Sequence, residues 1–457
     1  MCECQDMSMD LTTPRNAYLS AFYKRSFAYH TVKNRMPIIL TQLIDMLSRN
    51  KEMITQQFGG DASEDLKTVI GEISKLKYEI QTNKPLAKLQ TQDEDIKLYN
   101  NHIDKQATEE GETTYFNTIW LLTECYMYRR IREIFSLTES FKNFDYFQSF
   151  KEEQFHQCNL EILKFWKKCI SDNLLAPTTD SNKLAQQAIF QNLIKAILWG
   201  NKCDLSISLG KILNNTDLLF NTDADNLDKF ILTDDRTNFI EYFFKINESQ
   251  DRAKLFDIVL DNSGYELIQD LCFATAIALF CSSQGPGQVK IRFHVKAIPW
   301  FISDVTKNDF SWTVEQIAQS PDTELSALGK QWKGFLNDNI WEVVVHSFWT
   351  TPFEFKYMEE VAPDLYSQLS QSDAIIFKGD LNYRKLFGEK NWDPCTPSKR
   401  VLKELNFKLS NILVIRTIKA DIVVGLKPGI VEECEKQDAQ WMANGDYGVI
   451  HFVNSVD

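Results

Sequence analysis

The fold of this chain follows from one stretch of sequence, Ala374-Ile375-Ile376-Phe377-Lys378-Gly379-Asp380-Leu381-Asn382-Tyr383-Arg384-Lys385. Its first four residues are apolar, which predicts a buried β-strand. Charged and polar side chains follow at once, in what we expect to be a loop at the carboxyl end of that strand. Open α/β sheets bind ligands at the carboxyl ends of their strands, so this polar cluster is a candidate site. The mixture of acidic and basic groups suggests an anionic ligand held beside a metal ion.

The chain around this stretch changes character near residue 185. Beyond it, apolar β-rich runs alternate with helical ones, and the runs expected as strands are 255–260, 289–298, 341–348, 374–377, 412–415 and 447–452. This alternation predicts an α/β fold with a mostly parallel sheet covered by helices. Before residue 185, apolar residues recur at helical spacing. We therefore expect three parts: a disordered tail (1–27), a helical domain (28–184) and an α/β domain (185–457).

The composition limits the classes of function. The chain has 457 residues, of which 50 are basic and 63 acidic, and its net charge of −13 argues against a broad nucleic-acid-binding surface. No apolar run approaches the roughly 20 residues that cross a bilayer, and the first residues lack the apolar core of a signal peptide. We expect a cytoplasmic or nuclear protein. The ten scattered cysteines are expected to be reduced thiols.

Acidic residues follow three of the predicted strands. Asp261 and Asn262 come after the run 255–260, Asp304 follows the apolar run that ends at residue 302, and Asp380 follows the strand of the opening stretch. Because parallel strands present their carboxyl ends at one edge of a sheet, we expect these groups to converge. Carboxylate and amide oxygens, without Cys or His, suit a divalent cation such as Mg²⁺ or Mn²⁺.

Two basic residues are expected at the same edge. Arg416 and Lys419 follow the strand predicted at 412–415, where they can offset the charge of a phosphate. The six histidines form no close-spaced pair, so a His-Glu-x-x-His zinc site is not expected. His346, at the end of a predicted strand, is interpreted as a core histidine.

Each of these features also has a purely structural interpretation. Ser263 and Glu266 have the spacing of a helix capping box, so Asp261 and Asn262 could simply form the turn that precedes a helix. Residues 380–382 could form an Asx turn, and Arg416 to Lys419 could be a solvated strand edge. The site interpretation is favoured because all of these groups are expected at one edge of the sheet.

Two helical segments are considered as further parts of the site. The segment from Glu124 to Arg130 is interpreted as the solvated face of a helix and is left outside the site. The helix that starts at Lys183 is expected to end at Gly200. Asn201 and Asp204, which follow it, could line the site.

Several motifs taken together resemble one family. They are Leu260-Asp261-Asn262-Ser263-Gly264, Pro299-Trp300-Phe301 with Asp304, Pro363-Asp364-Leu365-Tyr366, the stretch 377–386 and Arg416-Thr417-x-Lys419. Over residues 28–453 the chain resembles the metal-dependent damage-control phosphatases, most closely the subgroup with the Arg-Thr-x-Lys motif, which acts on sugar phosphates. A eukaryotic branch of this subgroup is also described as a methyltransferase of acidic residues in proteins.

The resemblance implies a fold, a cofactor and roles for particular residues. The implied fold is a helical N-terminal domain packed on a three-layer α/β/α domain, and the implied cofactor is a divalent metal, Mn²⁺, Co²⁺, Ni²⁺ or Mg²⁺. The metal ligands implied by position are Asp261, Asn262 and Asp304. The implied substrate-binding residues are Asp261, Asn262, Asp380, Leu381, Asn382, Tyr383, Arg384 and Lys419. The implied substrates are small sugar phosphates, above all fructose 1-phosphate and fructose 6-phosphate, and no nucleic-acid or membrane partner is expected.

The expected reaction is metal-dependent hydrolysis of a phosphomonoester, with Asp261 and Asp304 as catalytic residues. The metal would polarise a phosphoryl oxygen, while Arg384 and Lys419 would offset charge on the other oxygens. Whether an aspartate acts as a nucleophile, as a base or only as a ligand stays open, because these roles look alike in a sequence.

Two other functions compete with this one. The first is methyl transfer from S-adenosylmethionine to glutamate residues of proteins, with a protein as the substrate. For that reaction, the turn after residues 255–260 offers a single glycine, Gly264, in place of a glycine-rich loop. The second is a noncatalytic scaffold that keeps a sugar-phosphate pocket, and the complete set of expected ligands argues against it.

Overall fold

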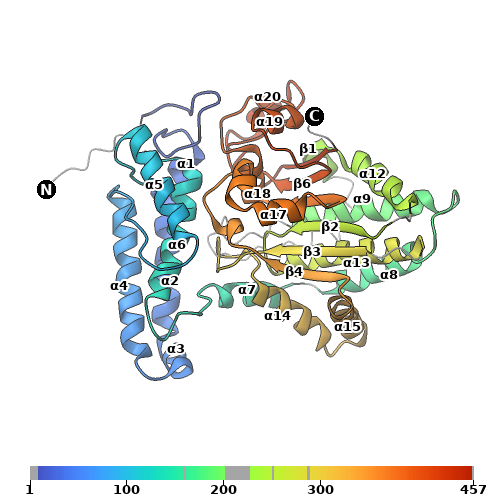
Figure 1. The fold of residues 1–457 in the computed structure, drawn as a ribbon, viewed down its shortest axis with the longest axis horizontal. Coiled ribbons are helices and arrows are strands. Elements are labelled where there is room, and N and C mark those ends of the chain that lie inside the picture. The colour runs from blue at the N-terminus through green and yellow to red at the C-terminus, as the bar shows by residue number, and fades with distance from the viewer. Residues whose placement is uncertain (1–8, 159, 201–226, 250–251, 286–288, 455–457) are drawn as a thin grey trace.

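The computed structural model describes residues 9–158, 160–200, 227–249, 252–285 and 289–454, and it contains a seven-stranded sheet (Figure 1). The strand order is β1-β7-β6-β5-β2-β3-β4. The strands are β1 (Ile231–Asp234), β2 (Lys254–Val259), β3 (Val289–Val295), β4 (Trp341–Val345), β5 (Ala374–Lys378), β6 (Ile412–Thr417) and β7 (Gly448–Val453). All neighbouring strands are parallel except β6 and β7. The predicted α/β class with a mostly parallel sheet is confirmed, while β1 is a strand that the sequence pattern does not predict.

Helices cover both faces of the sheet. One face carries α8 (Glu161–Leu174), α9 (Lys183–Gly200), α12 (Arg236–Glu248) and α13 (Tyr265–Ser283), and the other carries α16 (Met358–Val361), α17 (Pro363–Leu369), α18 (Asp380–Phe387) and α19 (Ser398–Glu404). Successive side chains of a strand point to opposite faces. In β5, Ile376 therefore joins the first core, whereas Ile375 and Phe377 join the second. Two cores separated by one sheet make the predicted three-layer α/β/α arrangement.

Helix α13 is the central helix of the first layer. By length and composition it could cross a membrane, and 83% of its apolar window is buried inside the protein. A helix that is apolar on all sides needs apolar neighbours on all sides. Here α8, α9 and the sheet supply them, so α13 is a core helix.

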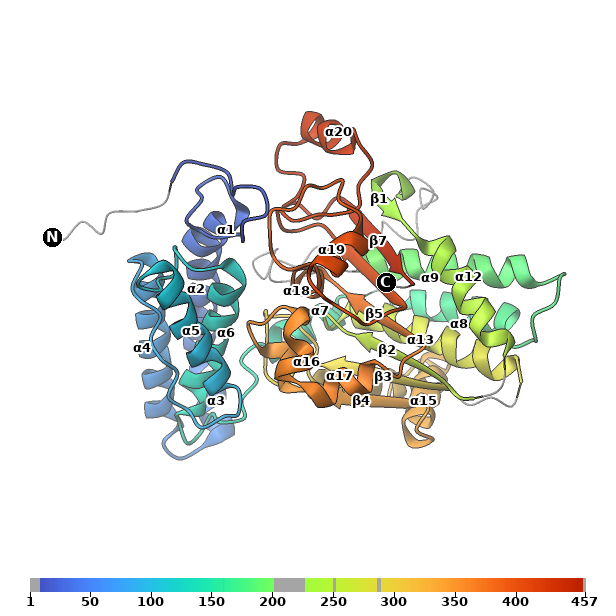
Figure 2. The same cartoon turned by 45° about the horizontal axis from the view of Figure 1, so that its top comes forward.

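The helical part stands beside the α/β part (Figures 1 and 2). It comprises α1 (Phe27–His30), a π-helical turn (Thr31–Arg35), α2 (Met36–Arg49), α3 (Lys51–Phe58), α4 (Ala62–Gln81), α5 (Ile96–Glu110) and α6 (Trp120–Ser136). Its apolar core runs without a break into the second core of the sheet. At the junction, the rings of Tyr128 and Phe301 stack with their centroids 4.5 Å apart. Helices α7 (Gln148–His156) and α8 lie against the α/β part, and the domain boundary at residue 184 stays a prediction.

The expected disordered tail is wrong for residues 9–27. Leu19 and Ala21 are buried in the core of the helical part. The N–H of Leu19 donates to the carbonyl of Glu389, and the N–H of Trp120 donates to the carbonyl of Leu19. These hydrogen bonds fix the segment because they satisfy backbone groups on both sides of it.

Asp304 does not follow a strand, in contrast to the prediction. Strand β3 ends at Val295, and the apolar residues that precede Asp304 form a turn in which Phe301 and Ile302 have φ angles of 42° and 69°. Such left-handed conformations interrupt a strand. The N–H of Asp304 donates to the carbonyl of Trp300 and closes the turn.

The polar stretch after β5 is a helix and not a loop. Gly379, with a φ of 86°, is the residue at which the chain leaves the strand, and α18 begins at Asp380. Only glycine adopts that φ without strain, which is why the strand can turn so sharply into a helix. Arg416 likewise lies inside β6 and not after it.

Candidate functional site

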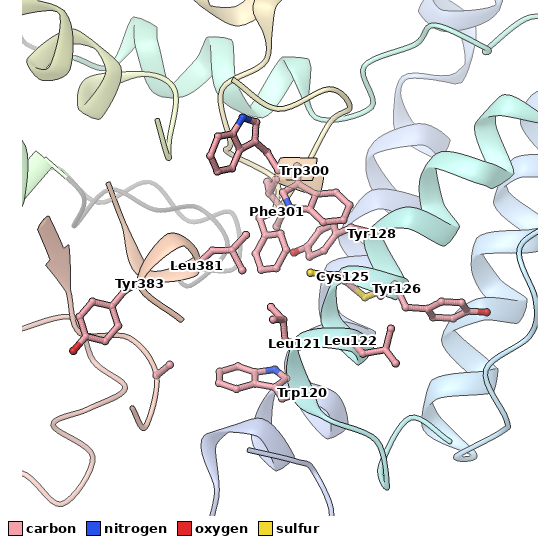
Figure 3. Packing of buried hydrophobic residues seen from close by; sticks show 14 of the residues in the cluster. Trp120, Leu121, Leu122, Cys125, Tyr126, Tyr128, Trp300, Phe301, Leu381 and Tyr383 are labelled. Atoms are coloured by element: carbon pink, nitrogen blue, oxygen red, sulfur yellow. The ribbon is translucent and has the colours of Figure 1, made fainter. Parts of the chain in front are cut away.

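A narrow cavity lies at the carboxyl edge of the sheet, where α6 of the helical part meets the turn at residues 300–304 and α18. Figure 3 shows three of the residues that line it, Trp120, Phe301 and Leu381. Its wall is formed by Arg35, Trp120, Glu124, Asp261, Phe301, Asp304, Asp380, Leu381, Arg384 and Lys419. Six of these were singled out in the sequence: Asp261, Asp304, Asp380, Leu381, Arg384 and Lys419. The cavity volume of 20 Å³ is on the order of what a single buried water needs.

The two acidic loops of the site are joined by their backbones. Asn262 and Asp304 form an isolated antiparallel bridge. On either side of it, the N–H of Ser263 donates to the carbonyl of Ser303 (2.8 Å), and the N–H of Val305 donates to the carbonyl of Asp261 (2.9 Å). Asp261, Asn262 and Asp304 are therefore neighbours although about 40 positions separate them, which backbone pairing achieves without any strand at residue 304.

The surroundings of the two aspartates are basic on one side and tightly packed on the other. Lys296 Nζ lies 3.0 Å from Asp304 Oδ2 and also donates to the carbonyl of Leu260. A Cβ at Gly379 would lie 1.9 Å from Asp261 Oδ2, so the backbone of the β5–α18 turn touches that carboxylate directly. Both aspartates are buried.

The three expected metal ligands fit a hard cation by their donor chemistry. Among the residues described, no group of three or more His, Cys, Asp or Glu side chains is arranged to hold a metal ion. The expected set of Asp261, Asn262 and Asp304 contains two carboxylates and an amide. These oxygen donors suit Mg²⁺ or Mn²⁺ and not a cation that prefers sulfur or imidazole.

Asp380 connects α18 to the Arg-Thr-x-Lys motif. Arg416 Nε donates to Asp380 Oδ1 at 2.7 Å, and the backbone N–H of Lys419 donates to the same oxygen at 3.3 Å. Arg416 also donates to the carbonyls of Ala420 and Ile422. Arg416 thus shapes the loop that carries Lys419 to the cavity wall, in addition to any effect of its charge.

Arg384 is held between the helical part and the α/β part. It donates to Glu124 Oε2 (2.8 Å) and to Glu389 Oε1 (2.5 Å), and its guanidinium lies 3.8 Å from the centre of the Trp120 ring. Burial raises the pKa of Glu389 to about 8 in spite of its contact with Arg384. The N–H of Leu121 donates to the other oxygen of Glu389. Arg384 therefore reaches the cavity as one member of a charge network.

Three of the expected substrate-binding residues do not line the cavity. Asn262 lies behind Asp261 and donates to its Oδ2 at 2.8 Å. Asn382 donates to the carbonyl of Lys378 at 2.7 Å and so caps the end of β5. Tyr383 points away from the cavity (Figure 3), where its hydroxyl accepts the N–H of Val424.

Four residues of the wall were missed in the sequence: Arg35, Trp120, Glu124 and Phe301. Glu124 was interpreted as part of a solvated helix face, but α6 is buried on nearly all sides. Glu124 lies among apolar residues in α6, and a charged side chain in such a helix is seldom fully buried unless it is paired. Its position among apolar residues was the available signal that Glu124 has a buried partner. Arg35 ends the π-helical turn before α2, and the sequence holds no comparable signal for it.

The remaining expectations have separate outcomes. The capping box at Ser263 and Glu266 does not form, because the first residue before α13 is Gly264 and no side chain caps this helix. His346 is not the core histidine that was expected, because it is only half-buried and its Nε2 lies 3.3 Å from the exposed carboxylate of Asp364. Asn201 and Asp204 lie outside the described residues.

The fold and the cavity together define a class: an α/β protein with a cavity of carboxylate, cationic and aromatic side chains at the carboxyl edge of its sheet, closed on one side by a helical part. The family model described as the damage-control phosphatase ARMT1-like domain matches residues 31–434, and the chain belongs to this family. This confirms the family that the motifs predicted and, with it, the prediction of an enzyme of the phosphatase class.

Full-length relatives agree with the family model. The chain is 39% identical to damage-control phosphatase ARMT1 of Xenopus laevis, over 96% of this chain and 99% of the relative. It is 36% identical to damage-control phosphatase ARMT1 of Homo sapiens, over 93% of this chain and 96% of the relative. A solved DUF89 family protein of Pyrococcus horikoshii covers 80% of this chain and 92% of its own, at 15% identity and a TM-score of 0.38.

Proposed function

We propose that this protein is a metal-dependent phosphatase of small sugar phosphates, with fructose 1-phosphate and fructose 6-phosphate as the favoured substrates. The proposal rests on the family and on one observation, the balance of charge in the cavity wall. The cationic side chains of the wall are Arg35, Arg384 and Lys419, and its carboxylates are Glu124, Asp261, Asp304 and Asp380.

Lys296 and Arg416 pair with Asp304 and Asp380 from behind the wall, so the carboxylates of the wall are largely balanced by cations without a bound metal. A phosphate monoester is close to a dianion at neutral pH, so a balanced wall gives it little net attraction. A divalent cation held by Asp261, Asn262 and Asp304 would make the site net positive and would polarise a phosphoryl oxygen. The charge balance therefore supports an anionic substrate that binds together with a metal.

The side chains opposite the metal ligands have distinct roles in this proposal. Lys419 donates to phosphoryl oxygens, where positive charge stabilises the transition state. Asp380, whose Oδ1 is held by Arg416, accepts hydrogen bonds from sugar hydroxyls through its other oxygen. Arg384 stays bonded to Glu124 and Glu389 and contributes a partly offset positive charge. The narrow cavity favours a small substrate and requires wall side chains to shift when the substrate binds.

The first test measures released phosphate. Metal-stripped protein is incubated with a panel of hexose and pentose phosphates, with one divalent cation added at a time. The wild type is expected to release phosphate only with a cation, and Asp261→Ala is expected to lose at least about a hundredfold in rate, the scale of losing a catalytic metal contact. Asp338→Ala, at a helix end remote from the cavity, serves as the control and keeps the wild-type rate.

The same experiment decides between phosphate release and methyl transfer. No release from any sugar phosphate with any cation would contradict the proposal and favour the S-adenosylmethionine-dependent reaction. The turn between β2 and α13, with Gly264 as its one glycine, is a poor match for a cofactor loop of that kind.

A further inference from the structure

We infer that Glu266 and Ser303 are positioning residues that fix the orientation of the Asn262 side-chain amide, so that its oxygen and not its nitrogen is available to a cation at Asp261 and Asp304. This inference rests on the proposed metal site and deepens it. It concerns residues behind the cavity wall, none of which belongs to the expected ligand or substrate-binding set except Asn262 itself.

The Asn262 amide is bonded on every side. Its Nδ2 donates to Glu266 Oε2 (2.8 Å) and to Asp261 Oδ2 (2.8 Å), and its Oδ1 accepts from Ser303 Oγ (2.5 Å). All four residues are at most 4% exposed. At this degree of burial each contact is expected to match a donor with an acceptor, because an unpaired polar group away from bulk water is costly.

The identity of Glu266 decides the orientation of the amide. A carboxylate can only accept hydrogen bonds, so the NH₂ group of Asn262 must face it and the carbonyl oxygen must face the other way. The opposite orientation would place Oδ1 against two carboxylates, those of Glu266 and Asp261. Only the observed orientation leaves an oxygen, with a second lone pair beyond the one that Ser303 uses, to bind a hard cation.

Glu266 is itself immobilised by a buried lysine. Lys378 Nζ, at the last residue of β5, donates to Glu266 Oε1 at 2.8 Å and to the carbonyl of Ile197 at 3.0 Å. It also lies 3.0 Å from Asp270 Oδ1. These contacts fix the position of Glu266 beneath the site. A continuous path of hydrogen bonds therefore links β5 through Lys378 and Glu266 to Asn262.

The test is the affinity of the full-length protein for Mn²⁺, measured by isothermal titration calorimetry without substrate. Glu266→Gln replaces an acceptor by an amide that can face Asn262 in either orientation. We expect it to weaken Mn²⁺ binding by about 10- to 100-fold, the usual effect of losing a partner that orients a metal ligand. Asp270→Asn is the matched control, because it also removes a carboxylate from Lys378 but does not contact Asn262. It should bind Mn²⁺ like the wild type.

A double variant that exchanges the carboxylate and the amide makes the test more specific. In the double variant Glu266→Gln, Asn262→Asp, the total charge is unchanged and the hydrogen bond is reversed, since the new amide donates to the new carboxylate. The new carboxylate loses the hydrogen bond that Asn262 donates to Asp261, but it presents oxygen in either orientation and bound Mn²⁺ offsets the repulsion between the two carboxylates, so part of the Mn²⁺ affinity should return. Wild-type affinity in Glu266→Gln, an equal loss in Asp270→Asn, or a folded double variant that does not bind Mn²⁺ would each overturn the inference.

Ser303→Ala keeps the inference testable if the variants at position 266 do not fold. It removes the hydroxyl that donates to Oδ1 and leaves Lys378 and its partners untouched, and it should weaken Mn²⁺ binding by about tenfold. Unchanged affinity would contradict the inference. Failure of the proposed function is a separate result: the wild type itself would then bind no Mn²⁺ or release no phosphate.

Discussion

Arg384 shows how a residue can be found in a sequence while its surroundings are not. Its position after a buried strand marked it as a phosphate-binding group, and it does line the cavity. Its guanidinium, however, is shared with two carboxylates, one from α6 and one that follows α18. Removing this buried cation would leave two buried carboxylates without their partner, which is strongly unfavourable. Arg384 therefore joins the two parts of the molecule and contributes to the cavity at the same time.

Gly379 forms the turn between β5 and α18 and also touches a carboxylate of the cavity wall, Asp261. Gly379→Ala adds a Cβ at a φ of 86° and 1.9 Å from Asp261 Oδ2, so the backbone is strained and the carboxylate must move. We expect the free energy of unfolding to fall by about 2 kcal/mol and the metal-dependent release of phosphate to be lost. Chemical unfolding and the phosphate assay measure the two effects.

Gly71→Ala provides the control for that substitution. Gly71 lies within α4, and a Cβ there would meet no atom within 4 Å. Because alanine favours helix, this variant should be as stable as the wild type or more stable by up to about 1 kcal/mol. A Gly379→Ala variant with unchanged stability and activity would show that the close contact in the β5–α18 turn is unimportant.

At the scale of elements, the antiparallel strand β7 places a histidine in the second core. His451 packs against Tyr383 and Phe387 of α18, with ring centroids 5.9 and 5.8 Å away. Burial, together with the nearby charge of Arg416, lowers the pKa of His451 to about 3. The folded protein thus keeps this imidazole neutral at pH values where the unfolded chain is protonated.

This difference predicts a loss of stability in acid. Between pH 6.5 and about 3 the unfolded state binds a proton that the folded state does not, so the free energy of unfolding falls as the pH falls, by about 1.4 kcal/mol per pH unit for this group. From pH 7 to pH 5 we expect a loss on the order of 2 kcal/mol from His451. His451→Phe should reduce the slope measured by urea unfolding at several pH values. Part of the slope should remain, since burial also lowers the pKa of His102, to about 4. An unchanged slope in the variant would contradict this account.

At the scale of the whole molecule, a continuous apolar core couples the helical part to the sheet. The same cluster contains Val69 of α4, Tyr128 of α6, Phe301 and Phe377 of β5. The cavity lies at this junction, so its wall is complete only when both parts are folded. We therefore expect the protein to melt in one transition that includes both parts.

Metal binding should raise the melting temperature of that single transition. A cation that binds only the folded protein raises the free energy of unfolding by about 2.7 kcal/mol at 100 times its dissociation constant. We expect added Mn²⁺ to raise the melting temperature of the wild type, a chelator to reverse the rise, and Asp261→Ala to show no shift. Differential scanning calorimetry measures these shifts. Two separate transitions, with only one of them moved by Mn²⁺, would show that the parts fold independently.

The sequence by itself determined the features that depend on local pattern. The run of apolar residues at 374–377 and the alternation of strands and helices were sufficient for the fold class. The polar residues near strand ends indicated most of the cavity wall, and the resemblance carried by the longer motifs indicated the family. These inferences succeed because the spacing of apolar residues and the residue types at strand ends are properties of short segments.

Only the tertiary structure decided how distant segments complete one another. It brought Glu124 of the helical part to Arg384, placed Asp304 beside Asn262 through a turn with left-handed residues, and turned Tyr383 away from the cavity. It also placed Glu266 under Asn262, where a capping box had been considered. No local pattern contains these contacts, because each depends on the packing of elements that are far apart along the chain.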